Sequence, residues 1–256
     1  MSHQTIAVSH DQGVTRIALN RPEVMNALNG AMRAEITAAL TALPKDTRCV
    51  VLTGTGRAFC SGQDLGDAGA ATDVGRILRE EYEPMLAAIA RAPVPVIAAV
   101  NGTAAGAGAN LALSADLVVA AESASFIQAF SRIGLIPDAG GTFILPRNIG
   151  RARALGLMLL AEPLSARQAA DWGLIWQALP DAEFPAAVEA MARKLAQGPT
   201  QSYLAIREAV QGSASNDMAA QLALEAELQT RMSRTHDFVE GVAAFGQKRA
   251  PQFTGR

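Results

Sequence analysis

Cysteine, histidine and aromatic side chains are scarce in this chain. Its 256 residues include two cysteines, three histidines and 5% aromatic residues. Cys49 and Cys60 are too few for a disulfide framework, and they lie too far from any histidine cluster for a zinc site. None of His3, His10 and His236 accompanies a serine or cysteine nucleophile motif, which argues against a histidine base. We therefore expect no metal site.

An excess of charge of one sign and long apolar runs are also lacking. The 22 Lys and Arg residues face 24 Asp and Glu residues, a formal net charge of -2, which argues against nucleic acid as a partner. No uncharged apolar run reaches membrane-spanning length, and residues 1–12 do not resemble a signal peptide. We expect a reduced, cytoplasmic location without a membrane partner. Because 50% of the residues are hydrophobic, the chain can bury a sizeable core.

Strand and helix patterns alternate along most of the chain and then give way to helices alone. The predicted strands are 5–9, 14–19, 49–54, 96–100, 117–121 and 174–177. The predicted helices are 29–43, 73–91, 142–160 with a turn at 147–150, 165–172, 187–197, 200–211, 217–231 and 237–247. This order predicts an α/β core over residues 1–196 and a helical region over residues 197–256. The Gly/Ala-rich residues 66–73 are predicted to form a mobile loop.

Residues 95–141 have the composition of a ligand site. A buried strand, 96–100, runs into a small-residue turn, 101–110, and then a helix, whose first N–H groups suit an anion or a developing oxyanion. Three interpretations compete. The turn could serve only close packing, or it could be a dinucleotide fingerprint, although Leu111 replaces the third glycine. The third interpretation is an oxyanion hole, which needs a second backbone donor from elsewhere.

Asp138 is the most informative carboxylate, because it precedes an Ala-Gly-Gly turn at a predicted helix start. One interpretation is a helix N-cap. The other is a general acid/base whose pKa is raised toward neutrality by apolar neighbours. The neighbours expected to enclose it are Phe130, Leu135, Ile136 and Phe143.

Other polar side chains allow weaker predictions. Asp64 follows a glycine turn and can contact a ligand, whereas Asp116 is expected to be a structural turn residue. Cys60 has no base in its motif, so we expect a small loop residue there. Trp172 and Trp176 are expected to make core or subunit contacts.

Several motifs, in order, resemble the crotonase (enoyl-CoA hydratase/isomerase) superfamily over nearly the whole chain. They are LNRP at 19–22, NAL at 26–28, FCSGQDL at 59–65, NGTAAGAGA at 101–109, PDAGGT at 137–142 and the tail 240–251. The resemblance implies an α/β, crotonase-like spiral of ββα units and a C-terminal helical region that forms a homotrimer or a dimer of trimers. It also implies an acyl-CoA substrate and no separate cofactor, since CoA is part of the substrate.

The resemblance also implies the site residues. The family's oxyanion hole uses two backbone N–H groups that map to Ser61 and Ala107, which supplies the missing second donor. The CoA adenine is then expected near Arg57, Ala58, Asp64 and Leu65. The full set of implied substrate contacts is Arg57, Ala58, Gly62, Asp64, Leu65, Gly106, Phe130 and Lys248. Lys248 and Phe245 could reach the CoA of their own chain or that of a neighbouring subunit.

Departures from the family pattern indicate the type of reaction. The two glutamates of hydratases fall at Asn110 and Phe130, neither of which can deprotonate water. Asp138 falls where isomerases carry their acid/base, and Asn110 is expected to orient the acyl group or a water. Displacement by Asp138 as a nucleophile, as in the superfamily's dehalogenases, is disfavoured because no histidine lies in the motifs.

The implied activity is therefore that of an acyl-CoA isomerase. Residues 104–113, 123–130, 151–157 and 164–176 most resemble isomerases that convert 2-(1,2-epoxy-1,2-dihydrophenyl)acetyl-CoA to oxepin-CoA in phenylacetate catabolism. Phe126, Phe130 and Phe143 either line an acyl pocket for such a ring or pack in the core. The alternatives are a Δ3,Δ2-enoyl-CoA isomerase of fatty-acid oxidation and a CoA-thioester-binding protein without catalysis.

Overall fold

Two β-sheets form the centre of the protein, whose computed structural model describes residues 3–67 and 73–256. The larger sheet has the strand order β1 (Ile6–Asp11), β2 (Val14–Leu19), β3 (Cys49–Gly54), β5 (Val96–Val100), β7 (Leu117–Ala121) and β10 (Gln177–Leu179). The smaller sheet has the order β4 (Ala58–Cys60), β6 (Thr103–Ala105), β8 (Ser125–Ile127) and β9 (Leu164–Ser165). β1 and β2 form an antiparallel hairpin, and the other pairings of the larger sheet are parallel.

Three successive units of chain each place one strand in each sheet. They are β3–β4, β5–β6 and β7–β8, and within the smaller sheet β4, β6 and β8 are parallel. Each unit is followed by at least one helix. The chain then returns to the larger sheet after the first two units and to the smaller sheet, at β9, after the third. This arrangement is the crotonase-like spiral of ββα units that the motifs imply.

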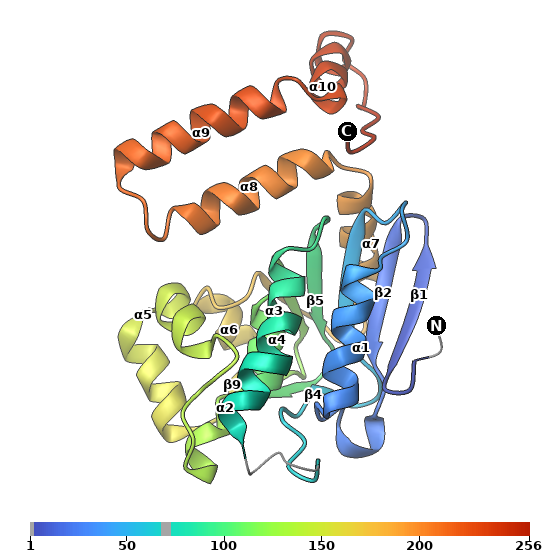
Figure 1. The fold of residues 1–256 in the computed structure, drawn as a ribbon. Helices are drawn as coiled ribbons and strands as arrows, with labels where there is room; N and C mark the ends of the chain where they lie inside the picture. Colours follow the sequence, from blue (N-terminus) through green and yellow to red (C-terminus); the bar gives the residue numbers. More distant parts are fainter. Residues whose placement is uncertain (1–2, 68–72) are drawn as a thin grey trace.

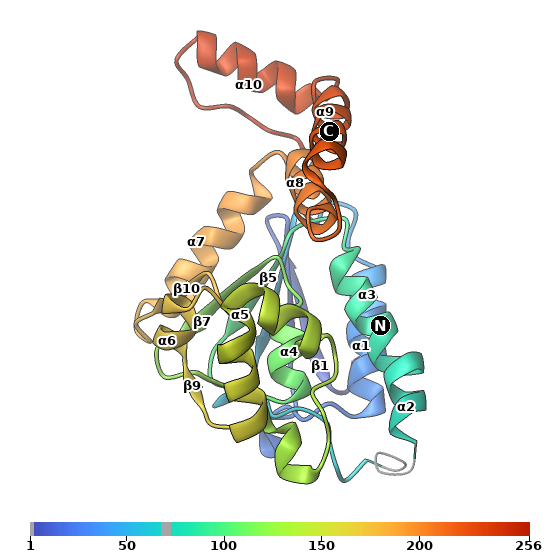
Figure 2. The ribbon, with the colours of Figure 1, turned by 90° about the vertical axis from the view of Figure 1, so that its left-hand side faces the viewer.

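Helices cover both faces of the larger sheet, so its central strands β3, β5 and β7 are largely buried, whereas the edge strand β1 is mostly exposed. On one face lie α1 (Gly30–Thr41), α3 (Glu83–Ala90) and α4 (Ala107–Leu113), and α7 (Phe184–Ala196) lies on the other (Figures 1 and 2). Alternate residues of β5 serve the two cores. Ala98 packs into the cluster with α1 and α4, and Ile97 packs into the cluster with α7.

The remaining helical segments connect these layers. They are η1 (Pro22–Val24), α2 (Val74–Ile77), the π-helical turn η2 (Leu78–Tyr82), η3 (Ala129–Ile133), α5 (Gly141–Leu160) and α6 (Ala166–Asp171). Gly150 has non-helical dihedral angles and divides α5, as the turn predicted at 147–150 requires. Side chains cap the starts of α1 and α6: Asn29 accepts from the Met32 N–H and Ser165 from the Gln168 N–H.

The C-terminal helices extend beyond the core. α8 (Thr200–Gly212) and α9 (Met218–Met232) run side by side, and α10 (His236–Gly246) follows at the far end (Figures 1 and 2). Arg207 of α8 donates to the Asp116 carboxylate and to the carbonyl oxygens of Ala92 and Val94. Asp116 also accepts from the Val96 N–H, so its predicted structural role is confirmed.

Some predicted elements differ from the structure. The predicted helix 73–91 contains the π-helical turn η2, and the predicted turn 101–110 contains the strand β6. The predicted strand 174–177 is wrong, because Leu174 and Ile175 are buried in the turn after α6 and β10 begins at Gln177. Residues 68–72 of the predicted mobile loop lie outside the described residues. No helix in the described ranges combines the length and the apolar character needed to cross a bilayer.

Candidate active site

Asp138 lies between two adjoining cavities of about 240 and 350 Å³. The smaller cavity is bordered by the loops that follow β4 and β6, which contribute Ser61, Gly62, Gly106 and Ala107. Because β4 and β6 are parallel neighbours, the loops at their carboxyl ends meet at one edge of the sheet. The other lining residues of the smaller cavity are mostly apolar: Gln63, Leu65, Val74, Ile77, Leu78, Tyr82, Ala129, Phe130, Arg132, Ile133 and Leu135.

The Asp138 carboxyl group is buried without full compensation. Its Oδ1 atom has no hydrogen-bond partner among the described residues. Burial raises the pKa of Asp138 from 3.8 to about 6, since a charged carboxylate is poorly solvated there. The N-cap interpretation is wrong, because α5 begins at Gly141 after Gly140 and receives no side-chain cap. A carboxyl group with a pKa close to neutrality can both accept and return a proton.

The enclosure of Asp138 differs from the prediction. Phe130 and Leu135 line the cavity as expected. Phe143 is 55% exposed, with the Arg147 guanidinium over its ring, and Ile136 is 79% exposed. Phe143 lines neither cavity, so it is not an enclosing wall, whereas Ile136 borders the larger of the two cavities despite its exposure. Leu78 and Tyr82 from η2 line both cavities.

Gly62 allows the two main-chain loops to approach closely. It has a φ of +99°, and a Cβ atom there would lie 2.8 Å from the Ala105 carbonyl oxygen and 3.5 Å from the Ala107 nitrogen. Ala107 is the first residue of α4, so its N–H has no acceptor within the helix. The Ala107 N–H is therefore suitably placed to donate to a ligand in this cavity.

Ser61 does not provide the free donor that the resemblance implies. Its N–H donates to the Met25 carbonyl oxygen at 3.0 Å. The cause is a run of main-chain pairing between residues 25–28 and 61–64, in which Leu28 also donates to Gly62 and accepts from Asp64. In this structure the prediction of two free N–H donors is therefore wrong at Ser61.

Asn110 does not face the cavity, so the prediction that it orients the acyl group or a water is wrong. Its side chain is fully buried on α4. Nδ2 donates to the Asp138 carbonyl oxygen at 2.8 Å, and Oδ1 accepts from Gln128 Nε2 at 2.9 Å. Both ends of the amide are thus occupied by protein groups.

The predicted CoA contacts fall into two groups. Gly62, Leu65, Gly106 and Phe130 line the smaller cavity together with Asp138. The structure places Arg57, Ala58, Asp64 and Lys248 outside that lining. Contact with CoA stays a prediction for the residues of both groups.

The second group has distinct surroundings. Asp64 pairs with Arg21 at 2.8 Å, and this hydrogen bond holds the pKa of Asp64 below its usual value. Ala58 is buried in β4, where its carbonyl oxygen accepts from Asn26 Nδ2 at 2.9 Å. Arg57 is exposed before β4, and Lys248 is exposed after α10.

A buried polar network beside the cavity was not predicted. Tyr82 donates to Gln63 Oε1 at 2.6 Å, and Arg33 Nη1 donates to the same oxygen at 2.8 Å. Arg33 is 1% exposed and also pairs with Glu81. The available signal was Arg33 itself, a charged residue on the otherwise apolar face of the predicted helix 29–43, between Met32 and Ile36.

Cys60 and Phe126 have structural roles. Burial raises the pKa of the Cys60 thiol to about 12, so a thiolate nucleophile is excluded at neutral pH. Cys60 lies in β4 rather than in a loop. Phe126 is 3% exposed and packs in the main core, so of the three predicted pocket phenylalanines only Phe130 borders the smaller cavity.

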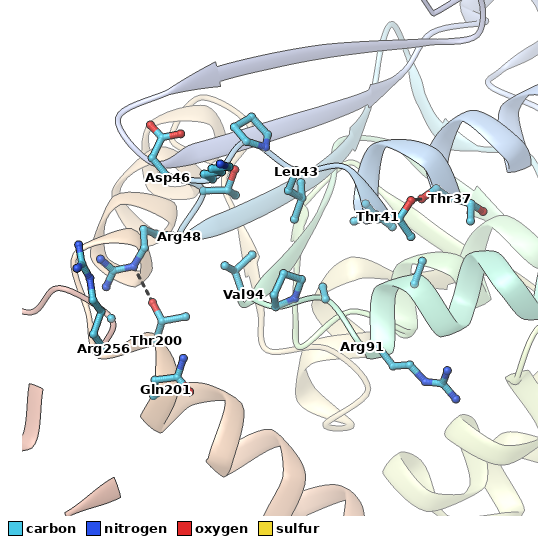
Figure 3. A pocket seen from close by; sticks show the side chains of 18 of the residues that line it. Thr37, Thr41, Leu43, Asp46, Arg48, Arg91, Val94, Thr200, Gln201 and Arg256 are labelled. Carbon is cyan, nitrogen blue, oxygen red and sulfur yellow. Dashed lines mark hydrogen bonds between the residues drawn. The ribbon is translucent and has the colours of Figure 1, made fainter. Parts of the chain in front are cut away.

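A larger cavity of about 1100 Å³ lies elsewhere, where the core meets the start of α8 (Figure 3). Its lining, within the described ranges, includes none of the predicted site residues. Arg48 donates to Thr200 Oγ1 at 2.7 Å and to the Gly198 carbonyl oxygen. Arg91 points away from Arg48 (Figure 3). We interpret this region as the joint between the core and the C-terminal helices.

Comparison with known proteins identifies the class. A family model described as enoyl-CoA hydratase/isomerase matches residues 9–256, and the chain belongs to this family, the crotonase family, which acts on acyl-CoA substrates. The chain is 57% identical over 257 residues to the "Probable enoyl-CoA hydratase" of Rhodobacter capsulatus, and 100% of each chain is covered.

Two further relatives bear on the reaction and the fold. The 1,2-epoxyphenylacetyl-CoA isomerase of Escherichia coli K12 is 48% identical over 257 residues, covering 97% of this chain and 98% of that protein. The crystal structure of an enoyl-CoA hydratase from Bacillus anthracis superposes with a TM-score of 0.91 at 33% identity, covering 99% of this chain and 100% of that chain. The chain is therefore a crotonase-family hydratase or isomerase.

Proposed function

We propose that this protein is an acyl-CoA isomerase in which Asp138 moves a proton on an enolate. The observation that carries the proposal is the Asp138 carboxyl group, which is buried in the cavity with its Oδ1 atom unpartnered and its pKa raised to about 6. Among the described residues, Asp138 is the one carboxylate in the lining of the smaller cavity. Isomerisation needs a single group that takes and returns a proton. Hydration needs a group that activates water, and the buried Asn110 amide is not such a group.

The main-chain N–H at the start of α4 would stabilise the enolate. The thioester oxygen accepts from the Ala107 N–H, which has no acceptor within the helix. Asp138 removes a proton from C2, and the negative charge develops on the thioester oxygen. Loss of one such donor costs about 2.7–4 kcal/mol of transition-state stabilisation. No cofactor is needed, because CoA is part of the substrate.

We propose 2-(1,2-epoxy-1,2-dihydrophenyl)acetyl-CoA as the substrate and oxepin-CoA as the product. The 48% identity to the Escherichia coli isomerase supports this choice, as do the aromatic walls provided by Tyr82 and Phe130. The C–C bond between the two epoxide carbons breaks as the ring expands to seven members, and the proton that leaves C2 is replaced by one delivered to a carbon of the conjugated ring system. The atoms of substrate and product are the same, so no oxidant or water is consumed.

A second candidate is a Δ3,Δ2-enoyl-CoA isomerase. The position of Asp138 between two adjoining cavities favours it, because an extended acyl chain could pass the carboxylate and occupy both. Asp138 would take the proton from C2 and return it at C4. The two candidates use the same carboxylate and differ only in the acyl group.

The test is incubation of the protein with enzymatically generated epoxyphenylacetyl-CoA, with a 3-enoyl-CoA and, separately, with a 2-enoyl-CoA. Products are followed by mass and ultraviolet absorbance. Oxepin-CoA supports the first candidate, and turnover of the 3-enoyl-CoA alone supports the second. A product heavier by one water would assign a hydratase and overturn the proposal. If the protein bound the thioester but formed no product and did not exchange the C2 proton with solvent, only a CoA-thioester-binding protein would remain.

A further inference from the structure

We infer that Asn110 is a positioning residue, which holds the main chain of Asp138 in place while leaving its carboxyl group free to turn between two carbon atoms. This inference rests on the proposed function of Asp138 as the proton carrier. Asn110 would affect the reaction by holding Asp138 in place, without contacting the substrate itself.

The Asp138 carbonyl oxygen accepts two hydrogen bonds, one from a residue of α4 and one from a residue of α5. Asn110 Nδ2 of α4 donates at 2.8 Å, and the Gly141 N–H at the start of α5 donates at 2.9 Å. Two donors occupy both lone pairs of the oxygen. The peptide group of Asp138 is therefore tied to two helices, while its side-chain Oδ1 has no partner in the described part of the chain.

Gln128 fixes the orientation of the Asn110 amide. Its Nε2 donates to Asn110 Oδ1 at 2.9 Å, and Gln128 is 3% exposed. If the Asn110 amide were turned over, its oxygen would face the Asp138 carbonyl oxygen and its NH₂ group would face the Gln128 NH₂ group. Both contacts would be repulsive, so the Asp138 carbonyl oxygen and the Gln128 amide together favour the orientation in which Asn110 Nδ2 faces Asp138.

The backbone beside Asp138 requires such support. Ala139 and Gly140 follow it with φ values of 47° and 82°, two consecutive residues in the left-handed region. A non-glycine residue is disfavoured there, so Ala139 is held by its surroundings rather than by its own preference. Release of the Asp138 carbonyl would let this turn relax and would move the carboxyl group.

Proton transfer between two carbons is sensitive to such a movement. Misplacement of a reacting group by about 1 Å can cost 10²-fold in rate. A fixed main chain with a mobile carboxyl group allows Asp138 to reach the donor carbon and the acceptor carbon in turn. Loss of the Asn110 donor should impair delivery to the second carbon more than removal from the first.

The test uses Asn110→Leu, which keeps the branched shape of the side chain without its hydrogen-bonding groups but is larger, with the smaller Asn110→Ala as a second variant in case the first does not fold. The control is Ser114→Ala, which removes a hydroxyl at the end of the same helix that donates to the Leu111 carbonyl oxygen. Each protein is incubated in D₂O with whichever substrate the wild type converts. Deuterium at C2 of recovered substrate and product formation are measured together. Affinity for an unreactive CoA thioester and cooperative unfolding are measured in parallel.

We expect kcat to fall about 10- to 100-fold in the Asn110 variants, with thioester affinity within about twofold of wild type. We also expect the ratio of product formation to C2 exchange to fall at least several-fold, whereas Ser114→Ala matches wild type. An unchanged ratio, with both rates lowered in proportion, would mean a merely structural role and would overturn the inference, as would wild-type rates. If Asp138→Asn retained exchange, the proposed function itself would fail, and that outcome is independent of the result at Asn110.

Discussion

Asp138 combines a partly buried position with an ionisable group, and this combination makes substitution there informative. Asp138→Asn keeps the size of the side chain but cannot accept the C2 proton. We expect turnover to fall by about 10²–10⁴-fold, with little change in thioester affinity. Steady-state kinetics and direct binding of an unreactive CoA thioester measure the two effects, and wild-type-like turnover would contradict the assignment.

The raised pKa of Asp138 also predicts opposite effects of pH on activity and stability. As a base it must be ionised, so kcat/KM should rise with pH through an apparent pKa of about 6. Because the pKa lies above 3.8, its ordinary value, the folded state binds this proton more tightly than the unfolded state. The contribution of protonated Asp138 to the free energy of unfolding is therefore fully present below pH 4 and is lost as the pH rises through about 6.

Asp138→Asn should therefore be more stable than the wild type at pH 8, and the difference should shrink at pH 5. The increase of about two pKa units sets an upper limit of about 3 kcal/mol, and partial exposure reduces it to about 1–2 kcal/mol. Urea unfolding of both proteins at the two pH values measures the difference. Equal stability at pH 8 would show that the carboxylate is not desolvated.

Two glycines of α5 provide a matched pair at the scale of one element. A Cβ atom on Gly141 would lie 2.4 Å from Asn110 Nδ2, whereas a Cβ atom on Gly156 would meet no atom within 4 Å. Gly141→Ala should displace the Asn110 amide, lower turnover at least tenfold, and destabilise the protein by about 1–3 kcal/mol.

Gly156→Ala should leave turnover unchanged and add up to about 1 kcal/mol of stability, because alanine favours a helix over the unfolded chain. Initial rates and urea unfolding of both variants make the comparison. Equal behaviour of the two variants would mean that α5 is not packed against Asn110 as described.

Elements with local signals were predictable, and elements without them were not. The caps Asn29 and Ser165 mark helix starts through their own side-chain hydrogen bonds, so α1 and α6 could be located from sequence. β6 has three residues, too few for a period of two to be recognised. The π-helical turn that places Tyr82 also has no sequence period of its own, and it arises within an otherwise regular helical pattern.

At the scale of the whole molecule, Arg207 connects the C-terminal helices to the core. Its side chain is 12% exposed, and its guanidinium donates to Asp116, Ala92 and Val94. Arg207→Met keeps much of the apolar stem but leaves two carbonyl oxygens and a carboxylate without their donor. We expect a loss of about 2–4 kcal/mol and faster amide exchange in α8–α10 than in β3 or β5.

Arg231→Met is the control, since the Arg231–Glu208 pair is half exposed and should contribute less than about 1 kcal/mol. Urea unfolding and hydrogen exchange by mass spectrometry measure both variants. Faster exchange throughout the core after Arg207→Met, with no excess in α8–α10, would contradict a role at this joint.

The C-terminal helices expose many large apolar side chains, which predicts an assembly. The exposed set is Ile206, Val210, Met218, Leu222, Phe238, Val239, Val242 and Phe245. A monomer rarely exposes so extensive an apolar surface. We propose a homotrimer or a dimer of trimers, and light scattering should give three or six times the chain mass. Replacement of Val242 by Glu should shift the protein to smaller species, and a monomeric wild type would refute the proposal.

The sequence by itself determined the α/β class, most of the helices and strands, the motifs of the family and the choice of Asp138 as the candidate acid/base. These features depend on local order: periodicity, capping residues and short contiguous motifs. Tertiary structure alone decided what surrounds Asp138, because residues 25, 61, 107, 110, 128 and 138 meet only when the spiral has formed. The engaged Ser61 N–H, the outward Phe143 and the buried Asn110 amide each depend on a partner distant in the chain, and no local pattern encodes such a partner.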